Sequence, residues 1–145
     1  MSDNAHFDVP PRAYAHGLTV DAADIDELGH ANNVVWVRWV NEAAIAHSRS
    51  VGLGAETYFT LGVIWVVRRH DIEYLGPARA GDALDALTWV DTLRGATSLR
   101  RTVIRPRGEL RVLARAATTW ALIDAKSQKP RRIPPEILGR YGFSV

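Results

Sequence analysis

The sequence predicts an α+β domain in which one long buried helix is followed by an antiparallel sheet. Residues 31–50 are apolar over most of their helical circumference, which is typical of a helix enclosed by other elements. Four later stretches have strand composition and are separated by short turns rich in glycine and proline. The chain has 145 residues, enough for one domain with its own core.

The N-terminal part of the chain divides into an arm and a first strand. Residues 1–12 are polar and contain two prolines, so we expect a flexible arm, with residues 13–145 forming the single domain. The stretch Tyr14–Asp21 alternates roughly between apolar and polar residues, which predicts a strand. The acidic residues 22–29 that follow predict a loop.

The stretch Ala31–Ser50 predicts the central helix. Arg38 and Glu42 lie four residues apart, on one stripe of an otherwise apolar surface. Three valines near its start also suit a strand, but the length of the run and the alanines after them favour a helix. Gly52 and Gly54 provide the stop.

The remainder of the chain predicts the sheet. The expected strands are Val63–Tyr74, Ala83–Leu93, Ser98–Arg105 and Leu110–Ile123. Because each pair is separated by a short turn, we expect an antiparallel meander. Pro134–Leu138 predicts a short final helix, since proline is tolerated in the first helical turn.

The predicted helix also indicates an oligomer. A single sheet covers one side of a helix, whereas this helix is apolar around most of its circumference. A second copy of the chain is the most direct cover for the other side. We therefore expect a homodimer, with a dimer of dimers as a further possibility.

Composition restricts the classes of function. The absence of cysteine excludes disulfides, thiolate metal sites and a cysteine nucleophile, and it agrees with the cytoplasmic location that we expect. No apolar run is long enough to span a membrane. Seven arginines lie between positions 94 and 115, with Glu109 as the single acid among them. They indicate either an anionic ligand such as a phosphate or a solvated sheet face, and no nucleic-acid-binding module is present.

The densest polar cluster precedes the helix and spans Asp24–Asn33, with the sequence DIDELGHANN. A helix start offers free backbone N–H donors and a partial positive charge. Acids placed there can act on a carbonyl group that those donors hold. The functional hypothesis therefore begins with this segment.

The pattern Asp-x-Asp-x-x-Gly-His-x-Asn-Asn at a helix entry resembles the hotdog-fold acyl-thioesterases, and most closely their 4-hydroxybenzoyl-CoA thioesterase-like branch. Plant acyl-ACP thioesterases carry a similar entry. The resemblance extends from about Tyr14 to Leu138 and includes the helix stretch WVRWVNEAA, the Gly81-Asp82 turn and the ending Lys129-Pro130 to Ile133-Pro134. It implies the hotdog fold and hydrolysis of an acyl-CoA or acyl-carrier-protein thioester without metal or redox cofactor.

The resemblance also implies roles for individual residues. Asp26 maps to the catalytic carboxylate, as nucleophile or as general base, and the oxyanion donor maps to the backbone N–H of Asn33. His30 and Asn32 correspond to the small polar groups of the family, with His30 as a further catalytic residue that orients Asp26, positions water or protonates the leaving thiolate, and Asn32 as a contact to the substrate. Capping or loop fixing is the alternative for each of these side chains, and loop fixing is the expected role of Asp24.

Candidates for substrate binding lie outside the motif. Trp36 stands where many relatives have tyrosine, and it lines an acyl or aryl pocket or packs in the core. Arg100 and Arg101 are candidates for the phosphates of coenzyme A. Because adjacent strand residues point to opposite faces, at most one of the two serves a given site.

Two other functions compete with hydrolysis. Enoyl-thioester hydratases of the same fold pair an aspartate with a nearby histidine, which Asp26 and His30 superficially match. A scaffold that binds an acyl chain without turnover is the non-enzymatic alternative. The acyl group itself is set by pocket shape, which the sequence does not define.

Overall fold

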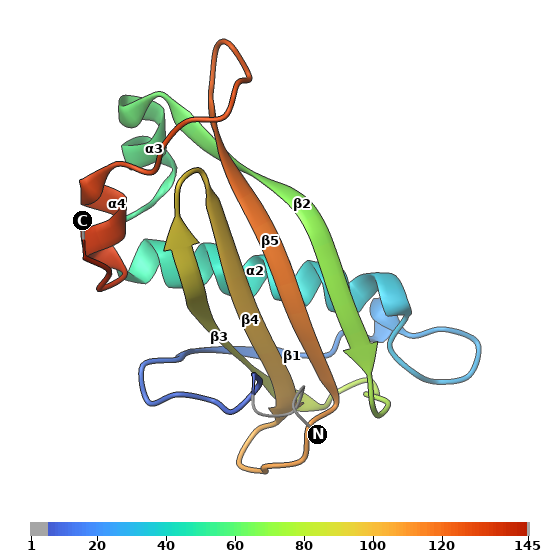
Figure 1. The fold of residues 1–145 in the computed structure, drawn as a ribbon. Helices are drawn as coiled ribbons and strands as arrows, with labels where there is room; N and C mark the ends of the chain where they lie inside the picture. The colour runs from blue at the N-terminus through green and yellow to red at the C-terminus, as the bar shows by residue number, and fades with distance from the viewer. Residues whose placement is uncertain (1–5, 145) are drawn as a thin grey trace.

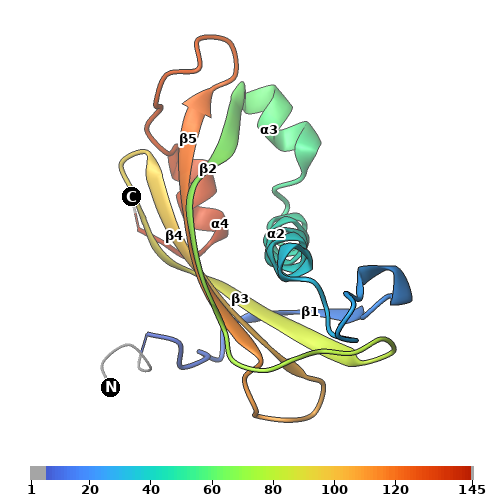
Figure 2. The same ribbon diagram turned by 90° about the vertical axis from the view of Figure 1, so that its right-hand side faces the viewer.

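The computed structural model describes residues 6–144, so residues 1–5 of the predicted arm and Val145 lie outside the description. The elements are β1 (Tyr14–Thr19), η1 (Ala22–Asp24), α2 (Asn33–Ser50), α3 (Ala55–Leu61), β2 (Val63–Tyr74), β3 (Ala83–Arg94), β4 (Thr97–Pro106), β5 (Ala114–Asp124) and α4 (Pro135–Arg140). The long helix α2 crosses one face of a curved sheet, which confirms the α+β hotdog fold (Figures 1 and 2).

The five strands follow the order β1-β3-β4-β5-β2, and every pair is antiparallel. The predicted meander is correct for β3, β4 and β5 but wrong for β2, which pairs with β5 along its length. The connection from β2 to β3 spans residues 75–82, which is too long for a tight hairpin turn. It carries the chain from β2, past β5 and β4, to the position of β3. As a result β2 is an edge strand.

Most element boundaries match the sequence prediction, but one strand starts later than predicted, and the short helices η1 and α3 were not predicted. The strand predicted from Leu110 begins at Ala114, because Leu110 is exposed in the loop between β4 and β5. Helix α3 was not predicted at all. It is only seven residues long, and its ends are set by Gly54 and by Gly62, which adopts a left-handed φ of 72°.

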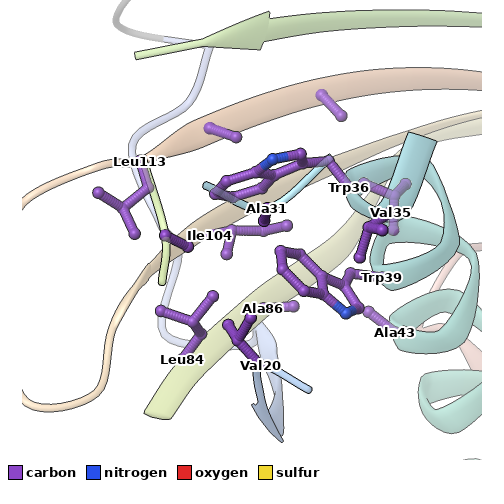
Figure 3. Packing of buried hydrophobic residues seen from close by; sticks show 14 residues of the cluster. Val20, Ala31, Val35, Trp36, Trp39, Ala43, Leu84, Ala86, Ile104 and Leu113 are labelled. Atoms are coloured by element: carbon purple, nitrogen blue, oxygen red, sulfur yellow. The ribbon is translucent and has the colours of Figure 1, made fainter. Parts of the chain in front are cut away.

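The core consists of two apolar clusters, one between the first half of α2 and the sheet and one between the sheet and the helices α3 and α4. In the first, Trp36 and Trp39 from the first half of α2 pack edge to face, with ring centroids 4.9 Å apart (Figure 3). The second cluster lies towards the other end of α2 and includes Leu53, Val63 and Ile137. The first cluster anchors the start of α2, where the candidate catalytic loop lies.

The N-terminal segment contacts the face of the sheet opposite α2 (Figure 2). Arg12 donates a hydrogen bond from Nη1 to the carbonyl of Val90 at 2.8 Å. The Phe7 ring lies 5.1 Å from the guanidinium carbons of Arg101 and Arg115. These contacts place the described part of the predicted arm against the sheet.

One side of α2 and the β2 edge stay uncovered in the single chain. Val34 is 74% exposed and Ile45 is 49% exposed, although both lie on the helix that the sequence predicts to be enclosed. Ile64 and Val67 on β2 are also exposed. Among the helices described for residues 6–144, none is both long and apolar enough to cross a membrane.

Candidate functional site

The loop that leads into α2 is organised around Asp26. Its Oδ1 accepts backbone hydrogen bonds from Leu28 at 2.9 Å and from His30 at 3.2 Å, and its own N–H donates to the carbonyl of His30 at 2.8 Å. Gly29 closes the turn with a φ of 80°, in the left-handed region that favours glycine. The carboxylate is thus held in a fixed position at the surface, and Oδ2 accepts no hydrogen bond from residues 6–144.

The first turn of α2 offers a free backbone donor. Asn32 is the N-cap, and its side-chain oxygen accepts from Val34 N–H at 3.3 Å, while Val35 N–H donates to the Asn32 carbonyl at 2.9 Å. Within the described chain no acceptor meets the N–H of Asn33. The donor to which the family resemblance assigns an oxyanion role is therefore open, and the Asn32 side chain acts as the cap.

Asp24 fixes the loop to the helix. Its two carboxylate oxygens accept from the guanidinium of Arg38 at 3.2 and 2.7 Å, and Arg38 also pairs with Glu42 at 3.2 Å. The hydrogen bond to Arg38 is the main reason that the pKa of Asp24 lies below its usual value. The Asp24 carbonyl further accepts from Asn32 N–H at 2.9 Å, so this acid has the loop-fixing role expected from the sequence.

The His30 and Trp36 side chains have different surroundings. His30 is half-buried, and its imidazole makes no hydrogen bond with residues 6–144. His30 therefore contacts Asp26 through its own backbone N–H and carbonyl groups. Trp36 is 2% exposed and contacts Trp39 and Tyr74 within the core cluster. In the single chain it packs in the core.

Arg100 and Arg101 point to opposite faces of β4. Arg101 lies on the face away from α2, where its Nε donates to Asp91 at 2.8 Å. Arg100 lies on the α2 side and is 4% exposed. Only Arg100 of the two therefore reaches the space between sheet and helix.

A cavity of about 1000 Å³ opens at the C-terminal end of α2. Its walls are mostly apolar and come from α2, α3 and strands β2 to β5, with Leu53, Val63, Trp65 and Leu93 among them. The volume suits a sizeable organic ligand. The helix has 18 residues and is about 27 Å long, so this cavity and the Asp26 loop lie at opposite ends of it within one chain.

A polar cluster is built into the cavity end of the core. Arg100 donates from Nη1 to His47 Nδ1 at 2.9 Å and to Thr88 Oγ1 at 3.1 Å. The His47 ring stacks on Tyr14, and Tyr141 Oη hydrogen-bonds Ser48 Oγ. Apart from Arg100, no member of this cluster could be recognised from the sequence, because the members come from β1, α2, β3, β4 and the end of α4, which are distant in the chain.

The cluster predicts an acid-sensitive contribution to stability. Burial, with a smaller effect of the Arg100 and Arg12 charges, lowers the pKa of His47 to about 4. At pH values between this pKa and the ordinary histidine pKa of about 6.5, His47 binds a proton in the unfolded chain but not in the folded chain. The stabilisation is therefore complete above pH 6.5 and is lost as the pH falls towards 4.

This pH dependence can be measured by comparing the parent protein with His47→Gln, which keeps an acceptor for Arg100 without a titrating ring. Between pH 7.5 and pH 4.5 the parent is expected to lose about 1–3 kcal/mol more unfolding free energy than the variant, after allowance for solvent screening. Urea denaturation at several pH values gives both curves. Parallel curves would contradict the assignment to His47.

The described residues contain no cluster suited to a metal ion: no three histidine or acidic side chains in 6–144 are arranged to hold one. The Asp26 loop and the helix start present a carboxylate and the open backbone N–H of Asn33. These two groups suit attack on a carbonyl group, with the N–H stabilising the oxyanion.

Comparison with known proteins identifies the family of the chain. The family model described as the acyl-ACP thioesterase N-terminal domain matches residues 11–141. The acyl-CoA thioester hydrolase YbgC of Escherichia coli O6:H1 is 28% identical over 118 residues, which cover 81% of this chain and 87% of YbgC. The chloroplastic palmitoyl-acyl carrier protein thioesterase of Gossypium hirsutum is 29% identical over 107 residues, covering 69% of this chain but 26% of the plant protein.

The fold has close counterparts among solved structures. The crystal structure of a 1,4-dihydroxy-2-naphthoyl-CoA thioesterase from Synechocystis superposes with a TM-score of 0.81 at 19% sequence identity, covering 89% of this chain and 95% of that one. The structural similarity shows the fold, and the family match, which spans most of the chain, also shows the family. The chain belongs to the family of the acyl-ACP thioesterase N-terminal domain and is a hotdog-fold thioesterase.

Proposed function

We propose that the protein hydrolyses acyl-CoA or acyl-carrier-protein thioesters with Asp26 as the catalytic carboxylate and the Asn33 N–H as an oxyanion donor. The observation that carries the proposal is the fixed Asp26 side chain, whose Oδ1 is held by two backbone N–H groups while Oδ2 stays free of the described residues. The open N–H of Asn33 follows seven residues later at the helix start. Both groups needed for attack on a thioester carbonyl thus belong to one short segment.

The carboxylate has two possible roles in this reaction. As a nucleophile it attacks the thioester carbon, the C–S bond breaks, thiolate leaves and water then hydrolyses the mixed anhydride. As a general base it removes a proton from the attacking water, and the acid and thiol form in one hydrolytic sequence. In a single turnover in ¹⁸O-labelled water, unlabelled product acid together with labelled Asp26 indicates the nucleophile, because water has then opened the anhydride at the Asp26 carbonyl. Labelled acid arises both from the general-base route and from water attack on the acyl carbon of the anhydride, so rapid-quench detection of the acyl-enzyme separates these two.

We further propose that a second copy of the chain completes the site at the exposed Asp26. The β2 edge is unpaired on one side, and exposed apolar residues on β2 and α2 adjoin it. An unpaired edge strand of 12 residues is a ready surface for pairing with another chain. We propose a homodimer in which the two β2 edges pair antiparallel about a two-fold axis.

This pairing brings the catalytic loop of one copy to the cavity of the other. At the end of β2, Tyr74 Oη donates to the Asn33 carbonyl at 3.2 Å, so this end lies beside the start of α2. The other end of β2, at Val63, lines the cavity. Because antiparallel pairing sets the Tyr74 end of one strand opposite the Val63 end of its copy, the site forms between subunits.

In this site between subunits, different regions suit different parts of the substrate. The apolar cavity suits the acyl group, and the exposed side chains of Arg49 and Lys126 at its wall suit the phosphates of coenzyme A or of a carrier-protein prosthetic group. Neither side chain pairs with an acid in the described part of the chain. A cytoplasmic location, where such substrates are made, stays a prediction.

The reaction class is tested with a panel of acyl-CoA thioesters and a thiol-detecting dye. We expect release of one thiol for each thioester consumed. Crotonyl-CoA separates the competing chemistry, because loss of enoyl absorbance without free thiol indicates hydration instead of hydrolysis. Thermal stabilisation by acyl-CoA with no product after long incubation would show a binding scaffold and contradict the proposal.

A further inference from the structure

Arg100 is a buried cation without an anionic partner. It is 4% exposed, and both hydrogen bonds from its Nη1 go to neutral acceptors, His47 and Thr88. No carboxylate among residues 6–144 forms an ion pair with it. Burial lowers its pKa, but a guanidinium keeps its charge in proteins. The other described partner of Arg100 is the face of the Tyr141 ring, whose centroid lies 5.9 Å from the guanidinium carbon. A buried charge that meets only neutral groups is costly, so its surroundings favour the arrival of an anion.

The guanidinium belongs to the wall of the 1000 Å³ cavity. Arg100 pairs with Thr118 and Ser98 pairs with Trp120 in the register of β4 with β5, so Arg100 and Trp120 lie on the same face of neighbouring strands. The indole Nε1 of Trp120 is a buried donor that has no acceptor in residues 6–144. One wall of the cavity thus holds two buried donors, the Arg100 guanidinium and the Trp120 indole N–H, that can each donate a hydrogen bond to a ligand.

The acid of the cavity wall does not neutralise Arg100. Asp124 accepts from the backbone N–H groups of Lys126 and Ser127, each at 2.9 Å, and pairs with Arg131 at 3.3 Å. The remaining lining is mainly apolar. A ligand that matches this cavity has an apolar stem and an anionic end.

We propose that Arg100 binds a carboxylate at the far end of the acyl chain, so that the preferred substrates are thioesters of dicarboxylic acids. This inference rests on the proposed function, which puts the thioester at the mouth of the cavity near Asp26 of the second copy. Arg100 is buried in the wall, whereas the cations suited to phosphate are exposed. A carboxylate matches the guanidinium in charge and can accept two parallel hydrogen bonds.

The test compares pairs of CoA thioesters of equal chain length that differ only in a terminal carboxylate, for example suberoyl-CoA against octanoyl-CoA, over a series of lengths. We expect the parent to favour the dicarboxylic member by about 10–100-fold in kcat/KM at its best chain length. The terminal carboxylate forms a charge-assisted pair with Arg100, whereas the monocarboxylic substrate leaves the Arg100 cation without an anionic partner. Arg100→Met should reverse the preference. Arg105→Met makes the same change on the opposite face of β4 and should keep it.

Binding gives a readout that is independent of hydrolysis. Monomethyl suberate, with one carboxylate, should raise the melting temperature of the parent more than dimethyl suberate does, and Arg100→Met should abolish this difference. If Arg100→Met does not fold, Arg100→Lys replaces it and should weaken the difference, since lysine lacks the planar pair of donors.

Two results would overturn the inference. One is equal kcat/KM for both members of every pair in the parent, and the other is an unchanged preference in the Arg100 variants. Either result leaves the proposed thioesterase mechanism intact. Conversely, full activity of an Asp26 variant would contradict that mechanism, while the suberate binding assay would still decide the role of Arg100.

Discussion

Asp26→Asn is expected to lower kcat for acyl-CoA hydrolysis by about 10²–10⁴-fold, with little change in KM. Asparagine keeps a side-chain oxygen in the Oδ1 position, where Asp26 accepts from the N–H groups of Leu28 and His30. The loop is therefore retained, while the group that attacks the carbonyl or activates water is lost. Initial rates of thiol release, measured over a range of acyl-CoA concentrations, give kcat and KM separately.

Asp21→Asn is the matched control for this experiment. Asp21 lies in the same loop, and its Oδ1 also accepts a backbone hydrogen bond, from Ala23 at 2.9 Å. The same isosteric change there should leave kcat within about twofold of the parent, because Asp21 only caps the short helix η1. An Asp26→Asn variant with the activity of the Asp21 control would exclude Asp26 from the chemistry.

The sequence predicted local elements better than their arrangement. The bounds of β2 match the prediction because Gly62 before it and the Gly76-Pro77 turn after it interrupt the strand pattern. Its pairing with β5 was not predictable, since strand composition does not reveal which of several similar strands is the neighbour. Helix α3 was missed because seven residues with two aromatics carry no helical period.

The candidate site divides in the same way. Local spacing predicted the loop role of Asp24 and the cap at Asn32, since both depend on contacts within fifteen residues of the chain. The environment of Arg100 depends on His47 and Thr88, which come from other elements. Alternation along β4 correctly assigned Arg100 and Arg101 to opposite faces, but only the folded chain shows which of them meets the cavity.

A heterodimer of two inactive subunits is expected to regain about half of the parent activity per dimer, because an isologous dimer has two equivalent sites. One subunit carries Asp26→Asn, and the other carries Ala44→Phe, which adds bulk at the cavity wall. Each homodimer has two defective sites. In the heterodimer, the intact Asp26 of the second subunit faces the intact cavity of the first, whereas the other site combines both defects.

Co-expression with two different affinity tags and sequential purification isolate this heterodimer for the thiol-release assay. The gain over either homodimer should be large, since each homodimer is limited to the residual activity of its variant. Melting temperatures near that of the parent confirm that Ala44→Phe acts through the cavity and not through unfolding. If Asp26 and the cavity of a single chain formed the site, the heterodimer would stay as inactive as its parents, because each of its subunits would still contain one defect.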